Sequence, residues 1–402
     1  MSLQKDYDMV VVGGGIHGAG VAQAAAAAGY STLLLEKTDW AAGTSSKSSK
    51  LIHGGLRYLQ GGHLRLVWES LRERETLLRI APHLVNIENF YIPVYRHSQI
   101  RAWQLRAGLS VYALLGGLHK HSKFATVPQK KWPDFTGLNT CDLQHLFCYQ
   151  DAQTDDDALT RAVVASAHNL GATLCCPATL AQAQHTTRGY ELQITLPAGP
   201  QQVTCGVLVN CAGPWINRVA ERISPTPAQM PVDLVQGAHL ILAPAVSQQR
   251  LYLESPTDGR AVFLLPWRGQ SLLGTTETLF TGDPDKVCPL PEEEAYLLAI
   301  FRHYFPDSDT TVVERMAGLR VLPKSSTNPF KRNREVHLIT CPLRKPAYIA
   351  VYGGKLTGYR ATAAKVIALA EKRLGPRATV ADTENLRLPD LSTELSSDPG
   401  ST

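Results

Sequence analysis

The chain has 402 residues, too many for one ordinary hydrophobic core, so we expect two domains, either consecutive or interleaved. Hydrophobic residues make up 44% and charged residues 19%, with no repeating glycine period, which excludes a fibre and indicates a globular protein of enzyme size. The net charge of +5 favours anionic ligands, but it is too small and too dispersed to indicate nucleic-acid binding.

The cysteines and the N-terminus indicate a reducing compartment. None of the 8 cysteines lies in a Cys-x-x-Cys spacing, so we expect reduced thiols and no metal site. An apolar strand begins at Met9 without the basic region of a secretory signal, and the longest apolar stretch, 107–118, is shorter than the roughly 20 residues that span a bilayer. We therefore expect a cytoplasmic protein.

The first predicted elements form a βαβ unit. The continuous apolar and β-branched run 9–12 predicts a buried parallel strand, and a helix over 19–28 follows it and ends at a glycine. Residues 31–35 predict a second buried strand.

Between the first strand and the helix, Gly13, Gly15 and Gly18 have the spacing Gly-x-Gly-x-x-Gly. Glycines at these positions allow a tight turn, close approach of a pyrophosphate to backbone N–H groups, and tight packing of the helix. Glu36 ends the second strand, where a carboxylate can accept hydrogen bonds from ribose hydroxyls. The motif, its context and the acid together predict dinucleotide binding rather than a structural glycine turn.

Further along the chain, amphipathic packing helices are predicted over 64–84 and 155–169. Short strands are predicted over 190–196, 203–210, 238–242, 262–265 and 272–275. The last three suit an antiparallel sheet that roofs a pocket. A buried strand over 348–352 then leads through a second glycine-rich junction into a helix over 359–374.

The most specific segment is 44–58, Thr-Ser-Ser-Lys-Ser-Ser-Lys-Leu-Ile-His-Gly-Gly-Leu-Arg-Tyr. It resembles the FAD-linked glycerol-3-phosphate dehydrogenases and oxidases, which are members of the glycine oxidase-like flavoprotein superfamily. Further blocks that resemble this family follow in the family's order at 210–215, 236–239, 274–277, 318–320 and 353–357. The resemblance covers roughly residues 5–370.

This resemblance implies an α/β fold in which a Rossmann-like FAD-binding domain is interleaved with an α+β substrate domain built on an antiparallel sheet. We assign 1–85, 150–225 and 341–376 to the FAD-binding domain, and 86–149 and 226–340 to the substrate-binding domain. The composition of 388–402 predicts a disordered tail. Bacterial members carry a further helical C-terminal domain, so the chain resembles a short form.

The implied activity is oxidation of sn-glycerol 3-phosphate at C2 to dihydroxyacetone phosphate. Hydride would pass to flavin N5, and the electrons would pass on to a quinone or another acceptor. The implied FAD-contacting residues are Gly13, Gly15, Ile16, His17, Gly18, Glu36, Lys37, Thr44, Ser45, Ser46, Leu51, His53, Ala212, Gly213, Trp215, Gly318, Arg320, Gly354, Lys355, Leu356 and Thr357.

A phosphate monoester needs several fixed positive donors, and arginine offers bidentate geometry. The family blocks supply Arg57, Arg320, Arg334 and Lys355, with Tyr58 as a neutral donor. Arg334 lies in a basic stretch that also reads as an exposed loop. Lys355 and the adjoining helix N-terminus can also stabilise negative charge on a reduced flavin, so Arg320 and Lys355 are assigned to catalysis as well.

Oxidation of an alcohol also needs a base near the carbinol hydroxyl, and histidine fits best. His53 and His239 both lie in family blocks, and the sequence does not decide between them. Glu277 is a weaker third candidate.

The segment 101–123 predicts an apolar helix with basic ends and interfacial aromatic residues. It suits either a buried connecting helix or peripheral contact with the inner face of the cell membrane, where a quinone is found. Three other functions stay open: a superfamily oxidase of a 2-hydroxy acid or amino acid, a catalytically silent flavoprotein subunit, and an NAD-dependent dehydrogenase.

Overall fold

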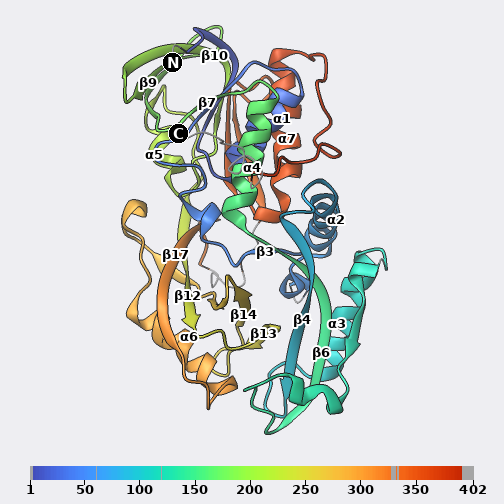
Figure 1. Ribbon diagram of the computed structural model, residues 1–402. Helices are drawn as coiled ribbons and strands as arrows, with labels where there is room; N and C mark the ends of the chain where they lie inside the picture. Colours follow the sequence, from blue (N-terminus) through green and yellow to red (C-terminus); the bar gives the residue numbers. More distant parts are fainter. Residues whose placement is uncertain (1–2, 60, 119, 327–331, 333–334, 392–402) are drawn as a thin grey trace, which may run out of the picture.

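The computed structural model describes residues 3–391 except 60, 119, 327–331 and 333–334, and it has two lobes along one long axis (Figure 1). Each lobe contains its own β-sheet. The helices are α1 (Ile16–Ala27), α2 (Leu64–Ile80), α3 (Ala102–Leu115), α4 (Asp156–Asn169), α5 (Ile216–Ala220), α6 (Pro291–Tyr304) and α7 (Tyr359–Leu374).

The first sheet has a parallel centre in which β1 pairs with β2 and β10, and β10 pairs with β19. Antiparallel strands β8, β9 and β18 extend it. Its strands are β1 (Asp6–Val12), β2 (Thr32–Leu35), β7 (Thr173–Cys175), β8 (Thr179–His185), β9 (Tyr190–Leu196), β10 (Gly199–Asn210), β11 (Ile223–Ser224), β18 (Val336–Cys341) and β19 (Tyr348–Gly353).

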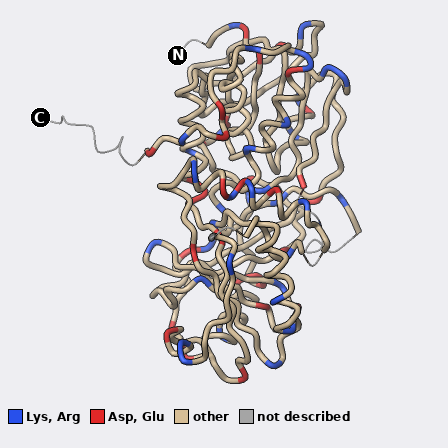
Figure 2. The backbone as a smooth tube through the Cα atoms, turned by 90° about the vertical axis from the view of Figure 1, so that its right-hand side faces the viewer, with Lys and Arg blue, Asp and Glu red and all other residues tan. Residues whose placement is uncertain are grey.

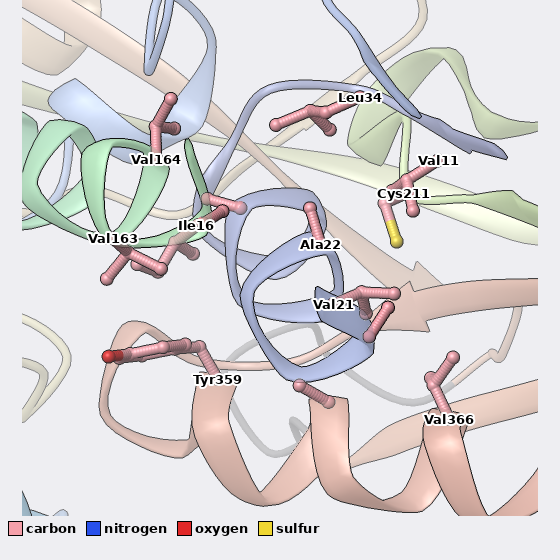
Figure 3. Packing of buried hydrophobic residues seen from close by; sticks show 14 of the residues in the cluster. Val11, Ile16, Val21, Ala22, Leu34, Val163, Val164, Cys211, Tyr359 and Val366 are labelled. Atoms are coloured by element: carbon pink, nitrogen blue, oxygen red, sulfur yellow. The ribbon is translucent and has the colours of Figure 1, made fainter. Parts of the chain in front are cut away.

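The central strands are buried on both faces, which explains why their sequences are continuously apolar. Met9 and Val11 of β1 face a cluster that α1, α4 and α7 complete, whereas Val10 packs on the opposite face. Figure 3 shows α1 enclosed between α4, with Val163 and Val164, and α7, with Tyr359. Small residues of α1 permit this close approach: a Cβ at Gly20 would lie 2.6 Å from the Tyr359 ring.

The second sheet is antiparallel except where β4 meets β13. Its strands are β3 (Leu51–Ile52), β4 (Val85–Tyr95), β5 (Phe124–Thr126), β6 (Leu143–Thr154), β12 (Val232–Ala243), β13 (Arg250–Glu254), β14 (Ala261–Trp267), β15 (Gln270–Gly274), β16 (Thr278–Phe280) and β17 (Thr311–Pro323). Helix α6 packs on one part of this sheet, and α3 covers the long β4–β6 pair (Figure 1).

The predicted fold class is confirmed, since a mainly parallel sheet with helices is interleaved in sequence with an antiparallel one. The proposed domain boundaries stay a proposal, and strand pairing differs from them at several places. β18, of which all but the last residue lies within 226–340, pairs in the first sheet. β3, within 1–85, and residues 150–154 of β6 pair in the second sheet. The helix expected over 64–84 ends at Ile80.

The C-terminal segment begins with ordered packing. Leu388 is buried, and its N–H donates to the carbonyl oxygen of Ile80. The expectation of a disordered tail over 388–402 is therefore wrong at its first residue, because an apolar side chain there completes the core beneath α2. The positions from 392 onward lie outside the described residues.

Acidic and basic residues are interspersed over both lobes, in agreement with the small net charge (Figure 2). Among the described residues, no helix has both the length and the apolar character that crossing a bilayer requires.

Replacing Gly18 with alanine should destabilise the protein, because the added Cβ would lie 1.8 Å from the Gly13 carbonyl oxygen. Overpacking of this kind costs about 1–3 kcal/mol of unfolding free energy, to be measured by urea denaturation. The matched control is Gly108→Ala in α3, where an added Cβ meets no described atom within 4 Å. That substitution should gain roughly 0.5–1 kcal/mol. Equal stability of the two variants would refute this account of the turn.

Candidate cofactor and substrate site

A cavity of about 530 Å³ lies between the two lobes, and both lobes line it. From the first sheet it receives the turns that follow β1, β10 and β19. From the second sheet it receives parts of β12 and β17, and the segment 44–58 runs along it. The elements that the sequence analysis connected to a cofactor therefore converge on one cavity.

At one end of the cavity, the glycine turn holds the start of α1. Gly13 has φ +110°, and a Cβ there would lie 2.6 Å from the carbonyl oxygen of Cys211, so position 13 suits glycine alone. The N–H of Ile16 donates to Ser45 Oγ at 2.9 Å, which brings the hydroxyl-rich segment to the helix N-terminus. Glu36 accepts the N–H of Gly14 at 2.7 Å, so its carboxylate is held at the cavity wall.

Two polar atoms in the wall show what kind of ligand the cavity suits. His17 Nδ1 and Trp215 Nε1 are buried and have no hydrogen-bond partner within the described part of the chain. Burial lowers the pKa of His17 to about 4, so its ring is neutral at pH 7. A neutral imidazole, an indole N–H and a glycine cradle fit an elongated ligand rich in acceptor oxygens, which is the chemistry of a dinucleotide such as FAD.

The wall at this end also carries charged contacts between the lobes. Lys37 lies over the Trp215 ring at 4.1 Å and pairs with Asp285, while Arg218 pairs with Asp283 at 2.8 Å. Lys37, Arg218 and Asp285 line the cavity. Lys37 was predicted at the site, but sequence reasoning missed Arg218 and the two aspartates, because no motif joins positions so far apart in the chain.

The second glycine junction forms another part of the wall and adjoins the first. Gly353 and Gly354 have φ of +73° and +98°, and a Cβ at Gly354 would lie 2.2 Å from His17 Nε2. Lys355 Nζ lies 3.3 Å from Ser70 Oγ and 4.0 Å from the centre of the Tyr58 ring. Thr357 Oγ1 accepts the N–H of His53 at 3.1 Å, which ties the two family segments together.

A group of positive side chains lies beside this junction. The centre of the Tyr58 ring lies 5.2 Å from Arg57 Cζ and 4.0 Å from Lys355 Nζ. Glu277 accepts from Arg57 Nη1 at 3.3 Å and from Arg320 Nη1 at 3.1 Å, and its side chain is only 5% exposed. A carboxylate that accepts hydrogen bonds from two guanidinium groups is engaged as their counter-ion, so Glu277 fits that role better than the role of a base.

The two histidine candidates differ in environment. His239 on β12 is 2% exposed, and its Nε2 lies 2.9 Å from Ser49 Oγ. Burial, with smaller effects of Arg320 and Lys50, lowers the pKa of His239 to about 3. Such a ring is a weak proton acceptor. His53 is half-buried, lines the cavity and has its backbone fixed by Thr357.

Most predicted residues line the cavity, with four departures. Gly18 packs against the Gly13 carbonyl, and Ser46 points its hydroxyl to the Gly43 oxygen, so neither is part of the lining. Arg57 is not part of the lining either, but it reaches Arg320 through their shared contact with Glu277. Arg334 lies outside the described residues.

Sequence reasoning also missed a buried ion pair beside the site. Lys50 Nζ lies 2.5 Å from Asp156 Oδ1, with side chains 6% and 0% exposed, and also donates to the Ser46 carbonyl. The signal was present, since Lys50 is in the family segment and Asp156 is in the acidic first turn of a helix. The sequence alone did not predict that Lys50 and Asp156 form an ion pair.

Acid should destabilise the folded protein through His239. Its pKa is about 3 when folded and near 6.5 when unfolded, so the unfolded chain binds the additional proton between these values. The unfolding free energy should therefore fall below pH 6.5, by up to about 1.4 kcal/mol per pH unit for this group. Urea denaturation between pH 7 and 5 should show a shallower dependence for His239→Gln. Identical pH dependences would contradict the neutral buried state.

The sequence profile of the family described as FAD dependent oxidoreductase matches residues 8–366. The chain is 36% identical over 366 residues to a protein named glycerol-3-phosphate dehydrogenase from Pseudomonas aeruginosa, covering 89% of this chain and 70% of that one. It is 34% identical to the D-erythritol 1-phosphate dehydrogenase of Brucella abortus, covering 90% and 72% of the two chains. The glycerol-3-phosphate dehydrogenase of Bacillus halodurans, solved in complex with FAD, matches with a TM-score of 0.74 at 25% identity, over 96% of this chain and 68% of that one. With that profile spanning most of its length, the chain belongs to the FAD-dependent oxidoreductase family.

Proposed function

We propose that the chain oxidises sn-glycerol 3-phosphate to dihydroxyacetone phosphate with FAD. The observation that carries this proposal is the grouping of Arg320, Lys355 and Tyr58 with His53 in the cavity wall, with Arg57 joined to Arg320 through Glu277. The names of the relatives from Pseudomonas aeruginosa and Bacillus halodurans support the same substrate.

The charges of this group suit a phosphate ester. Arg57, Arg320 and Lys355 bring three positive side chains to one place, and the two guanidinium groups offer bidentate donor geometry. A phosphate ester presents three acceptor oxygens to such a donor set, whereas a carboxylate presents two. The donor set therefore favours a phosphorylated alcohol over a 2-hydroxy acid or an amino acid.

We assign the base to His53 rather than His239, because His239, although it lines the cavity, is only 2% exposed and has its Nε2 in contact with Ser49. His53 would accept the proton of the C2 hydroxyl as the C2 carbon becomes a carbonyl. The chemistry that FAD supplies when bound is acceptance of the C2 hydrogen with its electron pair at flavin N5. The N-terminus of α7 and Lys355 would stabilise the negative charge that follows.

The residues that would hold FAD divide between the two glycine junctions. The turn at Gly13 and Gly15 and the carboxylate of Glu36 suit the pyrophosphate and ribose. His17 Nδ1 and Trp215 Nε1 would find partners on the cofactor, since the described residues supply none. Gly354, Lys355 and Thr357 would lie along the isoalloxazine ring.

Anaerobic addition of sn-glycerol 3-phosphate to the purified yellow protein tests the proposal. We expect loss of the visible flavin absorbance within seconds, with no response to glycine or 2-hydroxyglutarate. Erythritol 1-phosphate is included because of the relative from Brucella abortus. Bleaching by erythritol 1-phosphate alone would show that the substrate is a longer polyol phosphate. Bleaching by glycine alone would contradict the proposed phosphate site.

The matched variants are Arg320→Lys and Lys355→Met. Because lysine lacks bidentate geometry and methionine lacks charge, both should raise KM for the phosphorylated substrate by about 10-fold or more, each tenfold being 1.4 kcal/mol. The control is Arg315→Lys. Arg315 lies on the outer part of β17, where it is paired with Glu294. Unchanged KM values in both site variants would exclude these side chains from the phosphate site.

We further propose that the electrons pass to a quinone at the inner face of the cell membrane, with α3 as the contact. Trp103, Val111 and Leu114 lie on α3 at helical spacing and are 70%, 39% and 65% exposed, and Leu118, in the turn after the helix, is 65% exposed. Arg101, Arg106 and Lys123 are exposed along the same segment. An apolar stripe with basic residues suits the interface of an anionic membrane.

Sedimentation with lipid vesicles tests this contact. The protein should bind vesicles containing phosphatidylglycerol and bind neutral vesicles more weakly, and Trp103→Ser with Leu114→Ser should weaken binding at least 5-fold. Substituting the exposed Leu279 of β16 and Val313 of β17 with serine is the control and should leave binding unchanged, because both lie outside α3. Equal binding of the two double variants would exclude α3 as the contact.

A further inference from the structure

We propose that Tyr112 of α3 is a positioning residue for the substrate site, acting through the backbone of Gly54. This inference rests on the proposed function, because it assigns a role in placing His53 and Arg57. The Tyr112 hydroxyl is not part of the cavity wall, so it touches neither substrate nor cofactor. Its effect must therefore be transmitted by the segment that carries the reacting side chains.

The first step is the contact itself. The N–H of Gly54 donates to Tyr112 Oη at 2.9 Å, and Tyr112 Oη donates to Asp151 Oδ2 at 2.7 Å. Tyr112 and Asp151 are each 2% exposed, and Gly54 is buried. Water therefore has no access to replace either hydrogen bond, and an unmet N–H at this place would cost about 1–3 kcal/mol.

The second step is the fit of the segment between two helices. A Cβ at Gly54 would lie 2.6 Å from Tyr112 Oη and 2.8 Å from the side chain of Leu71 on α2. The backbone at this residue therefore touches α2 and α3 at once, and glycine is the residue that fits. The next residue, Gly55, has φ +81° and packs against the Tyr58 ring, where a Cβ would lie 2.4 Å from it.

The third step is the rigidity of the hydroxyl. Asp151 accepts from Arg74 Nη1 at 2.9 Å, and Arg74 is fully buried. Arg74 also donates to the carbonyl oxygens of Gln150 and His121, each at 3.2 Å. Burial and the Asp151 charge raise the pKa of Tyr112 well above its usual value, so the hydroxyl keeps its proton and its donor role.

The fourth step is the position of this contact relative to the reacting groups. His53 N–H is bound by Thr357 from the first lobe, and Gly54 N–H, one residue later, is bound by Tyr112 from the second. The two anchors set the path of the chain from His53 to Arg57 and Tyr58. Small misplacements of reacting groups cost large factors in rate, so removal of one anchor should be seen in catalysis.

The test is Tyr112→Phe, with Tyr304→Phe as the matched control. Tyr304 is 3% exposed, and its hydroxyl donates to the Glu254 carbonyl at 2.7 Å, far from the cavity. Both variants lose one buried hydroxyl, and Tyr112→Phe should lose more stability because it also leaves the Gly54 N–H unmet. Only Tyr112→Phe should raise KM for glycerol 3-phosphate and Kd for inorganic phosphate, by 3- to 10-fold, with a smaller fall in kcat. Equal KM and Kd in both variants and the unmodified protein would overturn the inference.

If Tyr112→Phe does not fold, amide hydrogen exchange in the unmodified holoenzyme tests the same inference. A peptide containing His53 and Gly54 should show both of these amides protected as strongly as those of β1, because each is bound by one anchor. Rapid exchange at Gly54 would overturn the positioning role. Failure of the proposed function gives a different result: unmodified protein whose flavin responds to neither glycerol 3-phosphate nor phosphate. A normal response there, with no change in Tyr112→Phe, would remove the positioning role alone.

Discussion

The parallel pairing of β1, β10 and β19 is the constraint on which the rest of the site depends. Parallel neighbours end at the same edge of a sheet, so the turns after Val12, Asn210 and Gly353 all arrive at one cavity. These turns lie far apart in the sequence, and only the hydrogen-bonded register of three strands brings them together. Strands β12 and β17 of the second lobe line the remaining side of the cavity.

Several charged side chains around the cavity are buried in ion pairs and hydrogen bonds that hold them in fixed positions. Glu277 lies between Arg57 and Arg320, Asp151 between Arg74 and Tyr112, and Asp156 beside Lys50. Such pairs add little net stability, because desolvation offsets most of their attraction, but breaking one leaves an unmatched charge. Their effect is to hold side chains and backbone in single positions around the cavity.

The sequence was sufficient where function depends on local chemistry. The glycine spacing, Glu36 and the segment 44–58 predicted the βαβ unit and the family, and the profile match confirms the family. The sequence was insufficient to predict those site features that depend on the packing of distant segments. No local sequence feature distinguishes His53 from His239, because the two differ in burial. The motif also does not predict that the Ser46 hydroxyl turns away from the cavity wall. Arg218 and Asp285 were missed because their proximity follows from tertiary structure alone.

The contact of Glu277 with both arginines bears on selectivity among small ions. An incoming anion meets guanidinium groups that already have a partner, so it must compete with an internal carboxylate rather than fill a vacant charge. Chloride, with one diffuse charge and no fixed geometry, gains little from that exchange. A phosphate ester brings two charges and three directed acceptor oxygens, so it can engage the arginines and Lys355 together. In the proposed phosphate site, the internal carboxylate would therefore disfavour monoanions relative to a phosphate ester.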